Sequence, residues 1–380
     1  MKPNFGKIST VKKHGKLIVK NFGPIKYAEI DLKQVMILIG PQGAGKSTLL
    51  KVIAAIQRYL RDADKLDFLG FETLCTQYYE VPRFSLVGAE IVYSNYGCHF
   101  EWKDGKVTSL KREIIKANLP NDVFIPAERN FFSIVDRRIF EITHYKVRLP
   151  NLLEVFGIWW RNAKEKVYSL EIEFFDSIKY SGVSGDFILY GPKDHSVLLQ
   201  ESASGFQSAI PMAIVIEFIA TYPASLFEQF DATGGEGETA LSDITAYSVF
   251  IEEPELNIFP TAQKRLVEFL ARKLIQNHEK NNSLFISTHS PYILTAIDNL
   301  LQASNASKTH PEAEGQIEKV IARECWIDFD EVTAYYVEAG KTVPILDKKN
   351  RSIAANKIDK VSEEISIEFD KLLDLTYQKA

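Results

Sequence analysis

Cysteine is scarce in this chain, and its three copies, Cys75, Cys98 and Cys325, lie far apart with no metal-binding spacing. We interpret them as reduced thiols in a cytoplasmic protein. The N-terminus lacks the pattern of a signal peptide. Long apolar runs are also missing, because the most apolar long segment, residues 209–220, is too short to span a bilayer and contains Glu217. No membrane partner is therefore expected.

An excess of charge of either sign is absent as well. The formal net charge of −5 gives no global attraction to nucleic acid, so any DNA contact would need a local basic patch. Lysine is frequent in residues 1–20, where a solvated arm is a better interpretation than a nucleic-acid contact. Internal repeats and sustained heptads are not apparent, and a length of 380 residues predicts one or two domains.

A glycine-rich stretch, residues 40–48, is the most informative part of the sequence because it fits the P-loop pattern G-x-x-x-x-G-K-[ST]. An apolar run at 35–39 predicts a buried strand before it, and helical spacing at 49–56 predicts a helix after it. The motif requires this order, and the alternative is a chance glycine turn before a helix. The predicted ATP-binding residues are Gly40, Pro41, Gln42, Gly43, Ala44, Gly45, Lys46, Ser47 and Thr48.

The residue types of the P-loop account for its phosphate chemistry. The glycines let backbone N–H groups point inward around the phosphates, and the helix N-terminus adds partial positive charge. Lys46 would reach the β- and γ-phosphates, and Ser47 would offer its hydroxyl to Mg²⁺. ATP and Mg²⁺ are therefore the predicted ligands.

Two adjacent carboxylates follow another predicted buried strand. Residues 248–251 are largely apolar and end in Glu252-Glu253, as a Walker B site requires. We assign Glu252 to the metal ion and Glu253 to the attacking water. Since the chain turns at a strand end, both side chains can face the nucleotide, although neighbours within a strand point apart. A charged strand terminus with no chemical role is the alternative.

Two further polar sites follow from position along the chain. His289 comes after the predicted strand at 283–287, where an imidazole can hydrogen-bond the γ-phosphate and hold the attacking water. Ser204, Gly205 and Gln207 open a long apolar helix, where a second anion site can form. An ordinary polar histidine and an ordinary serine N-cap are the respective alternatives.

Taken together, these residues resemble the ABC-type ATPase heads of the SMC-like branch, and most of all the OLD-like (overcoming lysogenisation defect) AAA ATPases. The likeness covers roughly residues 15–300. It rests on the order of P-loop, signature, Walker B and switch histidine, and on the motifs NFGPI at 21–25, IPAER at 125–129, EEPE at 252–255 and STHSP at 287–291.

The resemblance implies a shared active site. Ser204, Gly205 and Gln207 would form the signature motif and touch the γ-phosphate of a partner's ATP. Two chains would close head to tail over two ATP molecules, as a homodimer that a larger assembly could include. Arg129 would contact a phosphate or cross the dimer interface, and a structural salt bridge is an equal alternative for it.

The sequence also departs from the wider pattern. Phe206 replaces the second glycine of the transporter signature, and Phe259 replaces the aspartate that usually follows Walker B. The short spacing between P-loop and signature, without heptads, excludes long coiled-coil arms. Too little chain follows His289 for a Toprim nuclease domain, and we interpret Asp328-Phe329-Asp330 as a loop before a hairpin.

We therefore expect an α/β protein, a P-loop NTPase of the ABC and SMC-head type with a mixed β-sheet core, an antiparallel β-meander and a helical insertion. The chain would be one ATPase head. Its nucleotide-binding core would comprise residues 1–64 and 200–300, its β-meander and helical insertion 65–199, and its C-terminal hairpin and helix 301–380.

The expected function is that of an ATP-hydrolysing dimeric switch of the OLD-like group. It would control a separate effector protein or act on DNA in bacterial anti-phage defence. Two alternatives stay open: the ATPase subunit of a transporter, and a nucleotide-dependent scaffold without hydrolysis. Co-purification with a membrane protein would favour the first alternative, and the adjacent carboxylates argue against the second.

Overall fold

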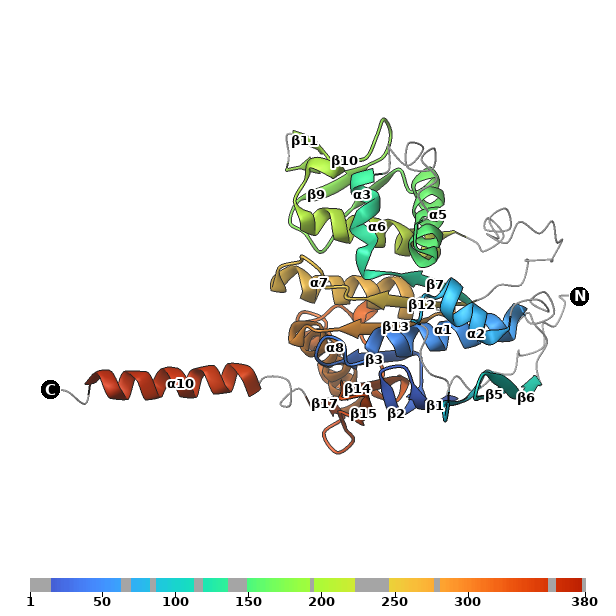
Figure 1. Cartoon of the computed structure of the whole chain (residues 1–380). Helices are drawn as coiled ribbons and strands as arrows, with labels where there is room; N and C mark the ends of the chain where they lie inside the picture. The colour runs from blue at the N-terminus through green and yellow to red at the C-terminus, as the bar shows by residue number, and fades with distance from the viewer. Residues whose placement is uncertain are drawn as a thin grey trace, which may run out of the picture.

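A large mixed β-sheet organises the chain (Figure 1). The structure is a computed structural model, and it describes residues 15–62, 70–82, 87–112, 119–135, 149–191, 195–222, 246–276, 281–354 and 360–377. The described part forms an 11-stranded sheet of order β6-β5-β4-β1-β2-β15-β14-β3-β13-β12-β7. Two smaller sheets accompany it, of order β11-β10-β9-β8 and β16-β17.

Five parallel strands form one side of the large sheet and end at the edge strand β7. They are β14 (Val332–Glu338), β3 (Val35–Ile39), β13 (Ser283–Thr288), β12 (Tyr247–Glu252) and β7 (Asn121–Ile125). Every residue of β3, β12 and β13 is buried. Their continuous apolar runs suit strands that are covered on both faces.

The other half of the sheet is mainly antiparallel and contains the predicted meander. Its strands are β1 (Gly15–Phe22), β2 (Ile25–Leu32), β4 (Glu90–Asn95), β5 (Cys98–Lys103), β6 (Lys106–Arg112) and β15 (Lys341–Pro344). Buried residues alternate with more accessible ones along β4 and β5, as in a sheet with one covered face. The predicted mixed sheet and β-meander are confirmed.

Helices cover both faces of the parallel half. Val35, Ile37 and Ile39 of β3 join one apolar cluster, while Met36 and Leu38 join the other. The second cluster is built on α1 (Lys46–Asp62). The first is built on α6 (Ser204–Thr221), α7 (Pro260–Leu270) and α8 (Pro291–Thr309). The alternation within one strand therefore divides the core into two layers.

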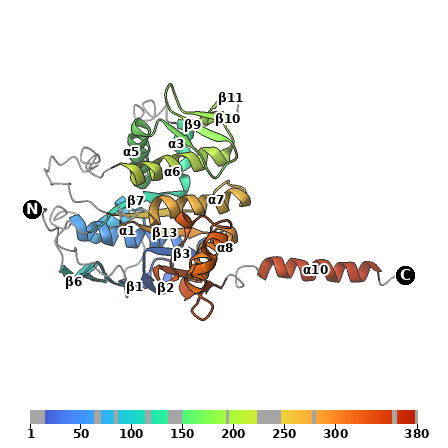
Figure 2. The ribbon, with the colours of Figure 1, turned by 180° about the vertical axis from the view of Figure 1, so that it is seen from behind.

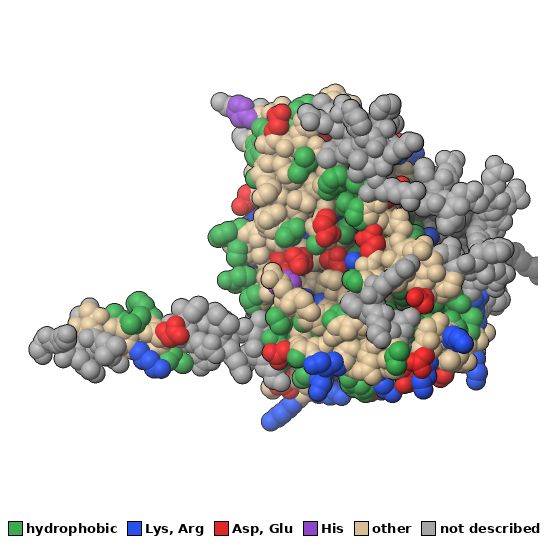
Figure 3. Space-filling model, in the orientation of Figure 1, with side chains coloured by type: hydrophobic (Ala, Val, Ile, Leu, Met, Phe, Trp, Pro, Cys, Tyr) green, Lys and Arg blue, Asp and Glu red, His purple; other side chains and the backbone are tan. Residues whose placement is uncertain are grey.

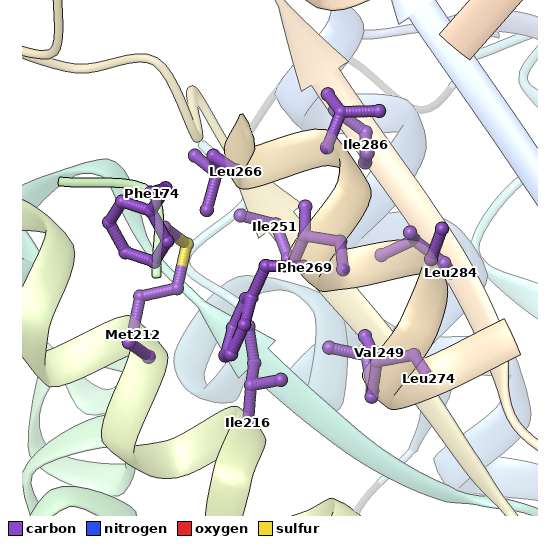
Figure 4. Packing of buried hydrophobic residues seen from close by; sticks show 14 of the residues in the cluster. Phe174, Met212, Ile216, Val249, Ile251, Leu266, Phe269, Leu274, Leu284 and Ile286 are labelled. Atoms are coloured by element: carbon purple, nitrogen blue, oxygen red, sulfur yellow. The ribbon is translucent and has the colours of Figure 1, made fainter. Parts of the chain in front are cut away.

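The insertion forms a separate layer above α7 (Figures 1 and 2). It contains α3 (Phe131–Val135), α5 (Asn151–Lys166) and the small sheet of β8 (Ser169–Glu171), β9 (Ile178–Ser181), β10 (Phe187–Tyr190) and β11 (His195–Leu198). Figure 4 shows how α6 joins it to the core. Side chains of α6, α7, β12 and β13 pack together there, including Met212, Ile216, Leu266, Phe269, Ile251 and Leu284.

Among the described residues, α6 is the one helix long and apolar enough to cross a membrane by length and composition. It is longer than the apolar segment recognised in the sequence, because the helix includes residues 204–208. Most of its residues are buried against the protein, including Ile210, Ile214 and Ile219. This burial identifies α6 as a core helix. A buried core helix can meet the same criterion of length and composition as a membrane-spanning helix.

Short elements and the C-terminal helix complete the chain. α10 (Lys360–Tyr377) stands away from the rest of the protein in both views (Figures 1 and 2). The others are α2 (Phe71–Thr73), η1 (Leu74–Tyr78), η3 (Ala127–Asn130), η5 (Leu199–Glu201), η8 (Ala271–Ile275), η9 (Pro311–Ala313), α9 (Glu314–Ile317), η10 (Arg323–Cys325), η11 (Phe329–Glu331), β16 (Leu346–Asp347) and β17 (Ser352–Ile353).

The structure differs from the predicted division of the chain in two places. β7 lies within the predicted insertion, yet it pairs with β12 in the nucleotide-binding core. β14 lies within the predicted C-terminal hairpin, and that hairpin with β15 is confirmed. However, β14 also pairs with β3 and is a core strand. Both differences arise from long-range strand pairing, which no local pattern encodes. The lysines of residues 1–14 lie outside the described residues.

Candidate nucleotide-binding and hydrolysis site

Three neighbouring strands bring the predicted site residues together. β3 leads into the P-loop, β12 ends at Glu252, and β13 ends one residue before His289. β13 lies between the other two and is parallel to both, with Thr288 opposite Ile39 and Ser287 opposite Glu252. The carboxyl ends of parallel strands meet at one edge of a sheet, so this register assembles the site.

All three glycines of the P-loop have a positive φ, and at two of them a Cβ would also clash with a neighbouring residue. Gly40 has a φ of +154°, and a Cβ there would lie 2.1 Å from the carbonyl oxygen of Val337. Gly45 has a φ of +103°, and a Cβ there would meet the side chain of Ile25 at 2.3 Å. The first close approach comes from β14, a strand that the sequence alone did not place beside the loop.

Lys46 lies at the first position of α1 and is buried. Its Nζ donates to the carbonyl oxygens of Gly40 and Pro41, at 2.8 Å each, and lies 3.4 Å from Nδ1 of His289. Burial lowers the pKa of Lys46 to about 8, although the nearby carboxylates of Glu253 and Glu255 oppose this shift. An anion in the loop would favour the charged ammonium.

Glu252 and Ser47 fit a divalent cation. The carboxylate of Glu252 is buried, and its Oε1 has no hydrogen-bond partner among the described residues. Burial raises the pKa of Glu252, while Lys51 and a hydrogen bond from Ser47 oppose this rise. Ser47 itself is exposed. A buried carboxylate oxygen without a partner, next to an accessible hydroxyl, is a suitable pair of oxygen ligands for Mg²⁺.

Glu253 and His289 form a pair at the same edge. Glu253 Oε1 lies 3.2 Å from His289 Nε2, and both side chains are partly exposed. Glu253 adopts a left-handed backbone with a φ of +43°, and its N–H donates to the Ser287 carbonyl at 2.8 Å. The chain thus turns at Glu253, as the sequence predicted. Because Nδ1 faces the Lys46 ammonium, the geometry fits a histidine with its proton on Nε2.

Glu255 is a site residue to which sequence reasoning assigned no role. Its Oε1 accepts hydrogen bonds from Thr288 Oγ1 and from the backbone N–H of His289, both at 2.7 Å. Ser290 caps α8 by accepting from the N–H groups of Tyr292 and Ile293. These bonds fix the turn that presents the imidazole. The EEPE motif carried the signal, but only the fold shows that Glu255 reaches the next strand end.

Arg129 is placed differently from its prediction as a phosphate or interface contact. It is fully buried, which keeps it from both the nucleotide and a partner surface. Its guanidinium donates to five backbone carbonyl oxygens, and burial lowers its pKa to about 10. The acceptors are Ser208 (3.0 Å), Pro126 (3.1 Å), Glu252 (2.8 Å), Glu253 (2.8 Å) and Pro254 (3.4 Å). The contacts of Arg129 also differ from the structural salt bridge that was the alternative, because all five of these acceptors are backbone carbonyl oxygens and not carboxylates.

The predicted signature residues lie at the start of α6. Ser204 is exposed at the first helical position, and the N-cap residue is Ala203, without a side-chain cap. Gln207 donates to the carbonyl oxygens of Gln200 and Ser202, so it holds the loop before the helix. A Cβ on Gly205 would lie 2.7 Å from the Asn257 carbonyl oxygen, in the turn after Walker B.

The two phenylalanines that depart from the family pattern have opposite environments. Phe206 packs edge-on against Phe175 and Tyr190 of the insertion, with ring centroids 4.7 and 5.8 Å away. Phe259 has 74% of its surface exposed, immediately before α7. On one face of the molecule, acidic side chains gather around a histidine (Figure 3). This agrees with the Glu253–His289 pair.

Strand order, P-loop and Walker B geometry together define a P-loop ATPase fold with a mixed sheet. Residues 15–88 match the family model described as an AAA ATPase domain, which agrees with this assignment for the part of the chain that contains the P-loop. Among curated proteins, none matches the sequence significantly.

Several solved structures are similar to this chain. One is "SMC head domain from Thermotoga maritima", with 13% identity and a TM-score of 0.35, covering 75% of this chain and 92% of that one. A second is a Pyrococcus furiosus Smc head domain bound to the C-terminal domain of ScpA, with 12% identity and a TM-score of 0.39, covering 93% and 99%. A third is the recombination mediator RecF with ATPγS, with 11% identity and a TM-score of 0.36, covering 88% and 99%.

Proposed function

We propose that this protein is an ATP hydrolase that acts as a head-to-tail homodimeric switch. The observation that carries the proposal is the contact series Lys46–His289–Glu253, which joins the P-loop to the ends of β12 and β13. Each member suits a step of phosphoryl transfer to water. The AAA ATPase match over residues 15–88 supports the same chemistry.

The site residues have distinct tasks in this mechanism. Lys46 would leave the loop carbonyls and neutralise the β- and γ-phosphates of ATP. Glu253 would orient the attacking water and draw its proton, while His289 holds the carboxylate and the γ-phosphate in place. Ser47 and Glu252 would hold Mg²⁺, which supplies positive charge to the phosphate oxygens when bound.

The dimer rests on the exposed start of α6. Ser204 and Gly205 open a helix that packs beside the turn after β12, and the exposed helix start can accept an anion from another molecule. Closing two copies head to tail would place each α6 start on the γ-phosphate that the partner holds. We further propose, from the motif likeness to OLD-like ATPases, that ATP-driven closure controls a separate effector or DNA in anti-phage defence.

Hydrolysis by three matched proteins tests the proposal. The wild type should release phosphate from Mg²⁺·ATP, Glu253→Gln should bind ATP but release phosphate at least about a hundredfold more slowly, and Lys46→Ala should not bind ATP. Glu171→Gln serves as control, because Glu171 is an exposed carboxylate on β8 of the insertion. A wild type no faster than Lys46→Ala would refute hydrolysis and favour a scaffold.

A further inference from the structure

The buried arginine that sequence reasoning placed at the phosphates instead joins two segments of the site. Nη1 and Nη2 of Arg129 donate to the successive carbonyl oxygens of Glu252 and Glu253, at 2.8 Å each. One carbonyl belongs to the peptide plane before Glu253 and the other to the plane after it. Holding both planes fixes φ and ψ of that residue.

This constraint matters because Glu253 has an unfavourable backbone. Its φ of +43° lies in the left-handed region, where the Cβ of an L-residue crowds the following carbonyl oxygen. Such a conformation persists only when surrounding contacts hold it. The Arg129 bonds and the bond from the Glu253 N–H to the Ser287 carbonyl provide those contacts.

The same guanidinium also reaches the start of α6. Its Nε donates to the Ser208 carbonyl at 3.0 Å, and Ser133 Oγ donates to the adjacent Gln207 carbonyl at 2.6 Å. Gly205 lies against the Asn257 carbonyl in the turn after Walker B. The start of α6 and the turn at 252–257 are therefore packed together and bonded to one short segment, residues 129–133.

We propose that Arg129 is a positioning residue which, with Ser133, couples the start of α6 to the turn that carries Glu252 and Glu253. A displacement of α6, such as closure of a partner onto Ser204, would then be transmitted to the carboxylate that orients the water. The proposal rests on the proposed function for its effect on hydrolysis. The coupling itself is a property of the single chain.

Arg129→Lys tests the coupling because it keeps the positive charge but loses the planar fork that reaches several carbonyls at once. We expect kcat to fall about tenfold to a hundredfold, because hydrogen bonds from a charged group are lost at the catalytic turn. The Kd for ATP should stay within about threefold of the wild type, since Arg129 does not touch the P-loop. Hydrogen exchange should quicken in residues 253–258 and 204–210 together.

Arg61→Lys is the matched control. Arg61 is also a largely buried arginine that donates to a carbonyl, that of Pro120, and it pairs with Asp122. It lies near the end of α1, opposite the P-loop end of that helix. If Arg129→Lys and Arg61→Lys lose kcat equally, or show equal changes in hydrogen exchange, Arg129 only contributes to the stability of the fold and the proposal is overturned. A folded Arg129→Lys protein that behaves like the wild type would also overturn it.

Ser133→Ala is the second variant. Unlike Arg129→Lys, it changes no buried charged group. It removes the bond to Gln207, so it should slow hydrolysis more mildly and quicken exchange in residues 204–210. If Arg129→Lys does not fold, unchanged hydrolysis and exchange in Ser133→Ala overturn the coupling. If the wild type does not hydrolyse ATP, the proposed function fails by itself. Hydrogen exchange of Arg129→Lys then decides. Faster exchange in both residues 253–258 and residues 204–210 supports the coupling, and unchanged exchange in either segment overturns it.

Discussion

At the scale of single residues, the site depends on burial as much as on residue type. Lys46 is placed among backbone carbonyls and beside His289, where it is shielded from water. Glu252 is buried with an unpartnered oxygen, whereas Glu253, one residue later, is accessible and paired with the imidazole. Two adjacent glutamates therefore have different chemistry because the chain turns between them.

The lowered pKa of Lys46 predicts a pH dependence of ATP binding. Burial lowers this pKa to about 8 in the free protein, and the phosphates of ATP would raise it. Below pH 8 the ammonium is already charged, so affinity should be nearly constant. Above pH 8 binding must take up a proton, and affinity should fall, by at most about tenfold per pH unit.

Calorimetry between pH 7 and pH 9.5, in buffers of different ionisation enthalpy, measures both the affinity and the proton uptake. Lys46→Arg is the control, since a guanidinium does not titrate in this range. If the wild type binds ATP equally well at pH 7.5 and pH 9.5 without taking up protons, the lysine is charged throughout, and the predicted shift is wrong.

At the scale of elements, helix starts and turns are held in place by contacts with their neighbours, some of which lie far away in the sequence. The start of α6 meets the turn after β12 through Gly205 and Asn257. The 3₁₀ helix η11 ends where β14 begins, and Asp328 caps it by accepting from the Asp330 N–H. The predicted loop at residues 328–330 is thus confirmed as a turn before the hairpin.

Gly205→Ala should destabilise the protein. The new Cβ would meet the Asn257 carbonyl at 2.7 Å, which forces α6 away from the turn and costs about 1–3 kcal/mol. Gly315→Ala in α9 is the matched control, because a Cβ there meets nothing within 4 Å and alanine favours a helix. Thermal melting should therefore show a lower Tm for Gly205→Ala and an unchanged or higher Tm for Gly315→Ala. Equal Tm values would mean that the α6 start adapts freely.

The chain should have no nuclease activity of its own. Asp328 pairs with Lys308 at 2.7 Å, and Asp330 pairs with Arg351 at 3.0 Å. Both carboxylates are therefore already paired with basic side chains and do not face a metal ion alone. No group of three or more metal-ligating side chains suited to a metal ion occurs among the described residues. Plasmid incubated with the purified protein and Mg²⁺ or Mn²⁺ should stay intact. Cleavage that survives repurification and disappears in Asp328→Ala would contradict this expectation.

At the scale of the whole molecule, the start of α6 packs beside the turn after β12, but its exposed Ser204 has no contact with Lys46 or His289 among the described hydrogen bonds and ion pairs. Lys46, Glu253 and His289 gather at the strand ends, while Ser204 begins the helix that joins the insertion to the core. This arrangement motivates a site that two chains share, which variants mixed in trans can test.

Lys46→Ala and Ser204→Arg should complement each other when mixed. Each variant alone should be inactive, the first because it lacks the phosphate-binding lysine and the second because a bulky cation blocks closure. A mixed dimer holds one site with an intact P-loop facing an intact α6 start, so part of the phosphate release should return, given that one competent site suffices. Mixing Lys46→Ala with Glu253→Gln,Ser204→Arg is the control and should stay inactive.

Light scattering of Glu253→Gln with and without ATP tests the same model independently. Because this variant should bind ATP without hydrolysing it, ATP should hold the closed dimer together and raise the molar mass. A variant that binds ATP with no change in mass, combined with a mixture that stays inactive, would rule out a site assembled by ATP-driven closure.

The sequence by itself determined the elements whose chemistry is local. The P-loop needs glycines, a lysine and a serine at fixed spacing, and Walker B needs an apolar strand that ends in carboxylates, so both could be predicted from the pattern. The β-meander was also predictable, because alternating burial over short strands leaves a period of two in the sequence. The order of the motifs, with His289 after the strand that follows Walker B, predicted that His289 and Glu253 gather at one edge of the sheet, where their side chains lie 3.2 Å apart.

Tertiary structure alone decided the features that depend on contacts between distant segments. Arg129 was predicted at a phosphate because it follows a strand end in a motif, but the fold closes over it and turns its donors to five carbonyl groups. The core positions of β7 and β14 depend on pairing with strands more than a hundred residues away in sequence. Side-chain periodicity reports which face of a strand is buried but contains no information about which strand lies beside it, so only the folded chain shows what Arg129 holds.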